Sequence, residues 1–173
     1  MNDDYTGYLK PFWSDEYLHL KYKKMPFNNK YDVSNWREKG YTQDEKYFTG
    51  QMCNYNETQP SWNETFISWA RYQHGLQNIG CCYYRMVTNE ILPVHEDDYK
   101  LYREKFKVKL SECYRILVFL EDWKSGHYFE FNNQPIVNWK RGDYFIWSGK
   151  VPHMAANIGI EDRYTLQITG HKK

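Results

Sequence analysis

One face of the fold can be read from the segment Arg163-Tyr164-Thr165-Leu166-Gln167-Ile168-Thr169. Side chains of a β-strand point alternately to opposite sides, which places Tyr164, Leu166 and Ile168 together on one side. The other side carries polar residues headed by Arg163. If that side looks into the interior of a barrel, the buried guanidinium is costly unless an anion lies opposite it. A polar face turned to solvent would give the same alternation at no cost, so the segment alone leaves both interpretations open.

The same two-residue period recurs from about residue 79 to the end of the chain. We expect strands at residues 80–87, 114–120, 128–131, 136–139, 144–147 and 164–169. Several short strands separated by turns are typical of a β-sandwich or a barrel. Gly142 is expected to fold two of these strands into a hairpin, and Gly126 is expected to do the same earlier in the chain.

The first half of the chain has a different character. Residues 1–60 are polar and rich in Tyr and Asn, and we expect them to wrap around the core. A helix is expected after Ser61, because Ser61 and Glu64 fit a capping box that satisfies free amides at a helix start. Apolar residues then recur at helical spacing, namely Trp62, Phe66, Trp69 and Ala70. With Gly75 as its stop, this amphipathic helix is expected to cover one face of the sheet.

Length and composition fit one domain, with residues 1–78 as wrapping segment and supporting helix and residues 79–173 as barrel core. The 23 basic and 22 acidic residues nearly cancel, which gives no bulk attraction for nucleic acid or an anionic membrane. Aromatic residues make up 19% of the chain, so rings must fill much of the core. The four cysteines lack zinc-site spacing and are expected to be reduced thiols. No apolar run is long enough to cross a bilayer, and no signal-peptide pattern is present, so we expect a cytoplasmic protein.

His95 and Asp97 lie two residues apart, which on an extended chain places an imidazole and a carboxylate on the same face. His153, which follows a predicted strand, can complete a set of three metal ligands. Two histidines and one carboxylate leave three positions of an octahedron open, which suits iron(II) oxygenases, whereas structural zinc sites usually have four protein ligands. Alternation turns Asp98 to the opposite face, so we expect Asp97 to be the ligand. Without His153 and Arg163, the His-x-Asp pair would be interpreted as a surface loop.

Arg163 comes ten residues after His153, and this spacing gives the polar face of the last strand a role. A planar guanidinium can hold a carboxylate through two parallel hydrogen bonds, and Thr165 on the same face can donate a third. Arg115, in the predicted strand 114–120, is expected to form a surface ion pair. If its face instead looks inward, it would meet a substrate near the barrel mouth.

Five segments have the order and spacing of a known enzyme family. They are Leu92-Pro93-Val94-His95-Glu96-Asp97, residues 114–126, residues 140–147, Pro152-His153 and Arg163-Tyr164-Thr165-Leu166. Over residues 79–171 the chain resembles the iron(II)- and 2-oxoglutarate-dependent oxygenases, especially the prolyl hydroxylase-like branch. The resemblance implies a mainly β fold with flanking helices, the double-stranded β-helix or cupin-like jelly-roll barrel. It also implies that His95, Asp97 and His153 hold iron(II) and that Arg163 holds the far carboxylate of 2-oxoglutarate.

The chain departs from the family where the co-substrate binds. Many prolyl hydroxylases have a tyrosine at the position of Phe119, so a hydroxyl that helps to hold 2-oxoglutarate is absent here. Tyr83 or Tyr84, on the strand before the His-x-Asp motif, is expected to supply this hydroxyl instead. Family members that halogenate lack the carboxylate at the position of Asp97, so its presence favours hydroxylation.

The resemblance implies a dioxygenase that uses O2 and decarboxylates 2-oxoglutarate to succinate while it hydroxylates an unactivated carbon. Ascorbate can serve such enzymes as a reductant. The first candidate substrate is a peptidyl or protein residue such as proline. A free amino acid or another small metabolite is the alternative, and a metal-binding cupin-like module without turnover is a further one. Repair of alkylated nucleic acid is disfavoured by the balanced charge and by the absence of a second arginine shortly after Arg163.

Overall fold

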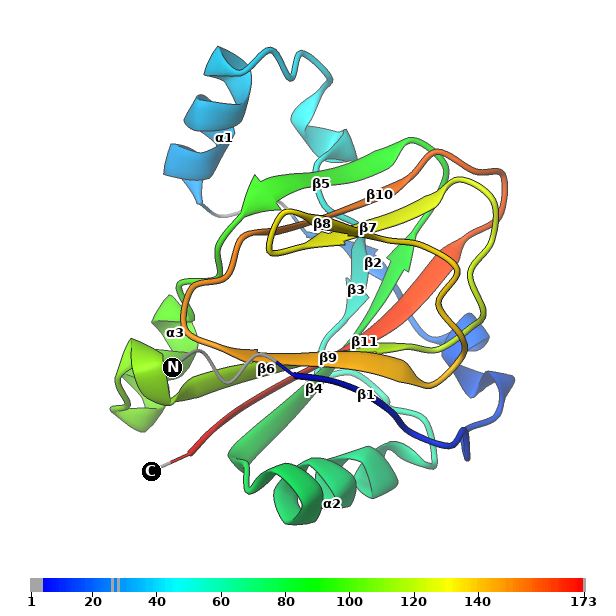
Figure 1. Cartoon of the computed structure of the whole chain (residues 1–173), viewed down its shortest axis with the longest axis vertical. Coiled ribbons are helices and arrows are strands. Elements are labelled where there is room, and N and C mark those ends of the chain that lie inside the picture. The colour runs from blue at the N-terminus through cyan, green and yellow to red at the C-terminus, as the bar shows by residue number, and fades with distance from the viewer. Residues whose placement is uncertain (1–4, 26, 28, 173) are drawn as a thin grey trace.

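Two antiparallel β-sheets dominate the computed structural model, which describes residues 5–25, 27 and 29–172. Figure 1 shows the sheets facing each other, with the smaller one above the larger one. In order across the larger sheet, the strands are β1 (Tyr5–Tyr8), β9 (Asp143–Ser148), β6 (Cys113–Phe119), β11 (Arg163–His171), β4 (Gln77–Met86), β3 (Gln51–Cys53) and β2 (Lys23–Lys24). In order across the smaller sheet, they are β5 (Glu90–His95), β10 (His153–Asn157), β7 (His127–Phe131) and β8 (Gln134–Ile136).

Helices flank the sheets, which confirms the prediction of a mainly β fold with flanking helices. Within the described residues the α-helices are α1 (Lys30–Glu38), α2 (Asn63–His74) and α3 (Lys100–Phe106). Short 3-10 helices are η1 (Asp15–His19), η2 (Glu45–Tyr47) and η3 (Leu110–Glu112). In this described part of the chain, no helix combines the length and the apolar character needed to cross a membrane.

Helix α2 lies against the outer face of the larger sheet (Figure 1). Phe66 and Ala70 of this helix are fully buried, so the predicted cover over the sheet is confirmed. Gly75 ends the helix with a left-handed φ of 66°, also as predicted. The predicted capping box is wrong, because the hydroxyl and the backbone N–H of Ser61 both donate to the carboxylate of Glu16 and the helix begins beyond Ser61.

The alternation along β11 separates an apolar face from a polar one, as the sequence predicts. Tyr164, Leu166 and Ile168 pack into the apolar cluster that includes residues of α2. Arg163 and Thr165 on the other face are only 3% and 2% exposed. The polar face therefore looks into the space between the sheets, and the alternative of a solvent-exposed face is wrong. Rings fill much of that space, as the composition predicts, namely Phe119, Phe129, Phe131, Trp139, Phe145 and Trp147.

The predicted strands all overlap observed ones, but the two predicted hairpins are wrong. The strands on either side of Gly142 lie in different sheets, and so do the strands on either side of Gly126. Both glycines have left-handed φ angles, 102° and 87°, so each does make a turn, but the turn carries the chain from one sheet to the other. The hairpin in this region joins β7 to β8 through Asn132 and Asn133, whose φ angles of 50° and 59° suit a two-residue loop.

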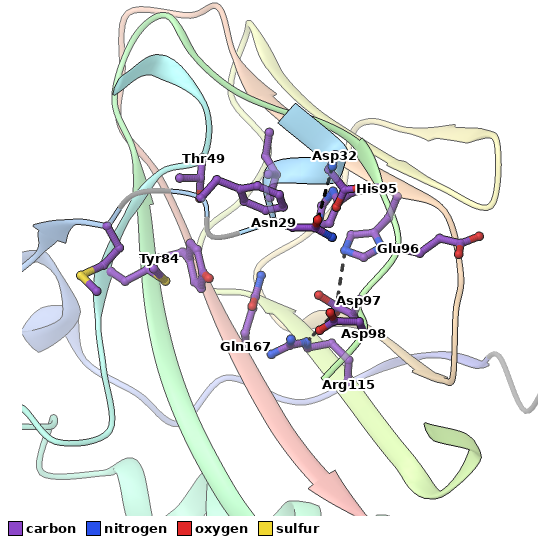
Figure 2. A pocket seen from close by; sticks show the side chains of 15 residues that line it. Asn29, Asp32, Thr49, Tyr84, His95, Glu96, Asp97, Asp98, Arg115 and Gln167 are labelled. Atoms are coloured by element: carbon purple, nitrogen blue, oxygen red, sulfur yellow. Dashed lines mark hydrogen bonds and ion pairs between the residues drawn. The ribbon is translucent and has the colours of Figure 1, made fainter. Parts of the chain in front are cut away.

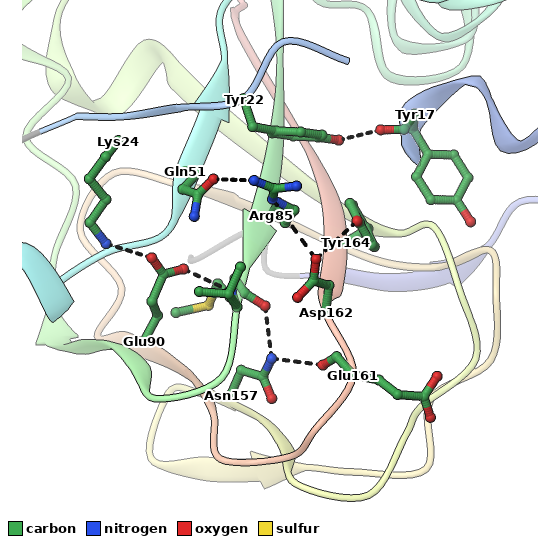
Figure 3. Close-up of polar contacts among 12 residues, drawn as sticks. Tyr17, Tyr22, Lys24, Gln51, Arg85, Glu90, Asn157, Glu161, Asp162 and Tyr164 are labelled. Carbon is green, nitrogen blue, oxygen red and sulfur yellow. Dashed lines mark hydrogen bonds and ion pairs between the residues drawn. The ribbon is translucent and has the colours of Figure 1, made fainter. Parts of the chain in front are cut away.

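Two buried polar residues, Glu90 and Asn157, join the N-terminal segment to β5 and link β10 to the chain around it (Figure 3). Glu90 of β5 is 3% exposed and accepts a 2.8 Å hydrogen bond from Nζ of Lys24 in β2. Asn157, at the end of β10, is fully buried and donates from Nδ2 to the backbone oxygens of Met86 and Glu161, both at 2.8 Å. The wrapping expected for residues 1–60 thus takes the form of strands β1, β2 and β3, which extend the larger sheet.

Truncation of Phe66 tests the contact between α2 and the sheet. The substitution Phe66→Ala should lower the free energy of unfolding by about 3–5 kcal/mol, because it leaves a cavity beneath the helix. Tyr72, on the same helix, is 82% exposed, so Tyr72→Ala should change that free energy by less than about 0.5 kcal/mol. Urea denaturation of both variants measures the difference. Equal losses in the two variants would show that α2 does not cover the core.

Candidate metal centre

Strand pairing brings His95 and His153 together although they are far apart in sequence. His95 is the last residue of β5 and His153 is the first of β10, and the two lie opposite each other in the antiparallel register. Their ring centroids are 4.3 Å apart. Asp97 follows two residues after His95, and one ligand atom from each of the three side chains lies within 4.8 Å of the others. The structure therefore places these three predicted ligands around one point.

Hydrogen bonds fix the tautomer of the two imidazoles, and burial keeps both rings neutral. The Nδ1 atom of His95 lies 2.8 Å from the backbone oxygen of Pro93, and Nδ1 of His153 lies 2.8 Å from that of Val151. A carbonyl oxygen only accepts, so Nδ1 carries the hydrogen in both rings and Nε2 keeps its lone pair. Burial, and then the nearby His153, lowers the pKa of His95 to about 4, and burial also lowers the pKa of His153. Both rings are thus held neutral and oriented, which is the form that binds metals.

Asp97 supplies the negative charge of the site. Burial favours its neutral form, but the charge of Arg115, and then the two imidazoles, outweigh burial, so the pKa of Asp97 lies below its ordinary value. Its Oδ2 atom lies 4.0 Å from Nε2 of His153, which is too long for a hydrogen bond. A carboxylate oxygen and a free imidazole nitrogen at this spacing can both reach an ion placed between them.

Arg115 forms an ion pair, but with a candidate metal ligand and not at the open surface. Its Nε atom donates to Oδ2 of Asp97 at 3.0 Å, and the two side chains are only 16% and 19% exposed. Its Nη1 atom donates to Oγ1 of Thr169 at 2.6 Å, and its Cζ atom lies 5.2 Å from the ring centroid of Tyr99. The face of β6 that carries Arg115 therefore looks inward, so the expectation of a surface ion pair is wrong.

A cavity of about 240 Å³ adjoins the three side chains. Figure 2 shows Tyr84 and Gln167 on one side of it and Asp32 near His95 on the other. This volume is below the range for drug-sized ligands and suits a small molecule or a single side chain. Thr49 and Asp32 show that the N-terminal segment builds part of the wall, a contribution that no sequence pattern identified.

Arg163 is a buried cation with few partners. It is 3% exposed, and among the described residues its Nε and Nη2 atoms have no hydrogen-bond acceptor, while Nη1 lies 3.6 Å from Sδ of Met86. The rings of Phe119 and Trp139, themselves stacked at 4.1 Å, lie 5.7 Å and 5.4 Å from its Cζ atom. Burial lowers the pKa of Arg163 to about 10, so it stays charged at neutral pH. A buried charge of this kind has the chemistry of an anion-binding group.

The two tyrosines offered for the co-substrate lie on opposite faces of β4. Tyr83 is fully buried on the α2 side, where its hydroxyl donates to Oδ1 of Asn63 at 2.7 Å. The expectation that Tyr83 holds the co-substrate is therefore wrong, because its hydroxyl points out of the barrel. Tyr84 lines the cavity and pairs in register with Thr165. Alternation alone cannot say which of two adjacent tyrosines faces inward until the register with β11 is known.

No protein-family model matches the chain, and no curated protein sequence matches it significantly. Solved structures do resemble it. A prolyl-4-hydroxylase from Pseudomonas putida aligns with a TM-score of 0.58 and 12% identity over 99% of this chain and 94% of that chain. The cupin domain of Schizosaccharomyces pombe Cnp3 has a TM-score of 0.42 and 11% identity over 70% and 64%. A salicylate 1,2-dioxygenase variant from Pseudoaminobacter salicylatoxidans has a TM-score of 0.35 and 12% identity over 54% and 21%.

The likeness to the prolyl-4-hydroxylase concerns the fold. It extends over nearly the whole of both chains, and together with the two facing sheets it identifies a cupin-like β barrel. The predicted double-stranded β-helix is thereby confirmed. At this level of identity the likeness says nothing about the reaction, which has to be argued from the side chains.

Metal binding can be measured on the protein alone. Manganese(II) at a hundredfold excess over its Kd should raise the free energy of unfolding by about 2.7 kcal/mol. His153→Ala should remove this stabilisation, because it deletes one of three ligands. His19→Ala, at an exposed position outside the site, should keep it. Denaturation with and without the metal makes the comparison, and an unchanged shift in His153→Ala would place the metal elsewhere.

Proposed function

We propose that this protein is an iron(II)- and 2-oxoglutarate-dependent dioxygenase that hydroxylates an unactivated carbon. The observation that carries the proposal is the buried Arg163, whose Nε and Nη2 atoms lack acceptors in the described part of the chain. Arg163 packs on the same interior ring cluster as His153 of the candidate metal set. A metal centre alone would not require a buried cation. A dicarboxylate co-substrate needs both a metal and a cation to hold its two ends.

The three ligands fit iron(II). Two neutral imidazoles and one carboxylate would hold the ion and leave positions for the co-substrate and for oxygen. The bound ion would supply the redox chemistry that couples decarboxylation of 2-oxoglutarate to succinate with oxidation of a carbon–hydrogen bond. The protein's own part is to keep His95 and His153 neutral by burying them, to orient their rings through the bonds to Pro93 and Val151, and to keep Asp97 ionised.

The surroundings of Arg163 fit the far carboxylate of 2-oxoglutarate. Nε and Nη2 form one edge of the guanidinium, which can donate two parallel hydrogen bonds to a carboxylate. Thr165 lies two residues on and is equally buried, so its hydroxyl can add a third bond. Phe119 and Trp139 limit the movement of the guanidinium and keep water from it. Because Phe119 has no hydroxyl, Tyr84 is our candidate for a further hydrogen bond to 2-oxoglutarate.

The cavity beside the metal ligands guides the choice of substrate. Its lining includes the carboxylates of Asp32, Glu96 and Asp98, whose charge opposes a polyanion such as nucleic acid. Its volume suits one side chain of a peptide or a small metabolite. We propose a peptidyl or protein residue, proline first, and keep a free amino acid or another metabolite as the alternative. A cupin-like module without turnover is less well supported, because it does not explain why Arg163 is buried without an acceptor among the described residues.

Turnover tests the proposal. The protein with iron(II), ascorbate and 2-oxoglutarate should form succinate, and a proline-containing peptide should raise the rate above the uncoupled level. Succinate and the hydroxylated peptide are measured together by mass spectrometry. Formation of succinate with free amino acids but with no peptide would select the alternative substrate class. Absence of 2-oxoglutarate binding at millimolar concentration would reject the function.

The substitution Arg163→Met should have opposite effects on binding and on stability. Loss of a charge-assisted pair should weaken 2-oxoglutarate binding by about 1.5–3 kcal/mol, roughly ten- to a hundredfold. The free energy of unfolding of the ligand-free protein should stay equal or rise, because a buried cation without acceptors is replaced by an apolar side chain. Calorimetric titration with 2-oxoglutarate in the presence of manganese(II) and urea denaturation measure the two quantities. Arg71→Met, at an exposed site on α2, is the control and should change neither.

A further inference from the structure

We infer that Arg115 is a positioning residue of the metal centre, which holds the carboxylate of Asp97 where a metal ion can use it. The inference rests on the proposed metal centre and adds to it a residue outside the three ligands. Arg115 would touch neither the metal nor the substrate in this role. It would act through Asp97 alone.

Asp97 is the ligand that the fold restrains least. His95 and His153 belong to paired strands, and each ring is tied to a backbone oxygen through Nδ1. Asp97 lies beyond the end of β5, in the connection that leads to α3, and its backbone is in no strand. Within the described residues, the hydrogen bond that its carboxylate accepts comes from Nε of Arg115, at 3.0 Å. The position of this ligand therefore depends on Arg115.

Arg115 can do this because it is itself held by the sheet. It lies in β6, directly opposite Thr169 of β11 in the antiparallel register, and its Nη1 atom donates to Oγ1 of Thr169 at 2.6 Å. The ring of Tyr99, which is 7% exposed, packs against the guanidinium at 5.2 Å. A continuous chain of contacts thus runs from β11 through Thr169 and Arg115 to the carboxylate of Asp97 (Figure 2 shows the last link).

Two simpler roles for Arg115 make different predictions. If it acted only as a charge, its removal would strengthen metal binding, because a cation close to the site repels a metal ion. If it served only as a wall of the cavity, its removal would change the affinity for a substrate and leave metal affinity unaltered. A positioning role predicts weaker metal binding in spite of the removed repulsion, typically by ten- to a hundredfold for a residue that orients a ligand. The sign of the change therefore separates the three roles.

The experiment is a calorimetric titration of the metal-free full chain with manganese(II), in the absence of 2-oxoglutarate. Arg115→Met should raise the Kd by ten- to a hundredfold. Arg115→Lys keeps the charge and one donor and should recover part of that loss. Thr169→Val removes only the support of Arg115 and should raise the Kd by a smaller factor in the same direction. Arg71→Met on the outer face of α2 is the matched control and should bind as the wild type does.

The outcomes separate this inference from the proposed function. If the wild type binds manganese(II) and Arg115→Met binds it equally well or more tightly, the positioning role is overturned and the metal centre stands. If the wild type does not bind the metal, the metal centre and the function fail together. If Arg115→Met does not fold, as judged by circular dichroism, Thr169→Val decides the matter, and an unchanged Kd in that variant rejects the role.

Discussion

The antiparallel pairing of β10 with β5 is the constraint on which the rest of the site depends. It sets His153 opposite His95 across the smaller sheet, so two residues far apart in sequence present their Nε2 atoms to one point. Strand β5 ends at His95 and β10 begins at His153, so the chain outside each strand can turn away from the sheet. This arrangement lets Asp97 fold back beside the two rings, although it belongs to no strand. A shift of this register by one residue would turn one ring to the opposite face of the sheet.

The alternation along β11 predicted two features of the fold, because this strand has an apolar face toward α2 and a polar face toward the interior. Leu166 and Ile168 pack on the side of the covering helix, and Arg163 is buried on the other face, which is one of the two interpretations that the alternation left open. The hairpins were predicted wrongly because a glycine turn specifies a change of direction and says nothing about the sheet that the next strand joins. Tyr83 was misplaced for a related reason. The side chains of neighbouring residues on a strand point to opposite faces of the sheet. Only the pairing with the partner strand shows which face is turned to the interior.

Other parts of the site left no trace in the sequence that could be used. Thr49 and Asp32 reach the cavity from the N-terminal segment, whose composition predicts wrapping but no register. Arg115 could be placed on a strand but was expected at the surface, because its partner is a residue in a connection, and periodicity does not set the path of a connection. The ion pair with Asp97 is a product of tertiary structure alone.

The two arginines of the interior have opposite relations to the fold. Arg115 is paired with Asp97, and its charge is used inside the protein, whereas Arg163 has no anion among the described residues. Among Asp97, Arg115 and Arg163, one carboxylate thus stands against two guanidiniums, and a divalent metal ion would add further positive charge beside Asp97. The proposed dicarboxylate would offset the positive charge of the metal and of Arg163, so each of the two ligands would lower the electrostatic cost of binding the other. By linkage, the proposed metal and dicarboxylate would then bind with positive coupling, which would act in both directions. The buried charges of Asp97, Arg115 and Arg163 are therefore one half of an arrangement that the proposed ion and co-substrate would complete.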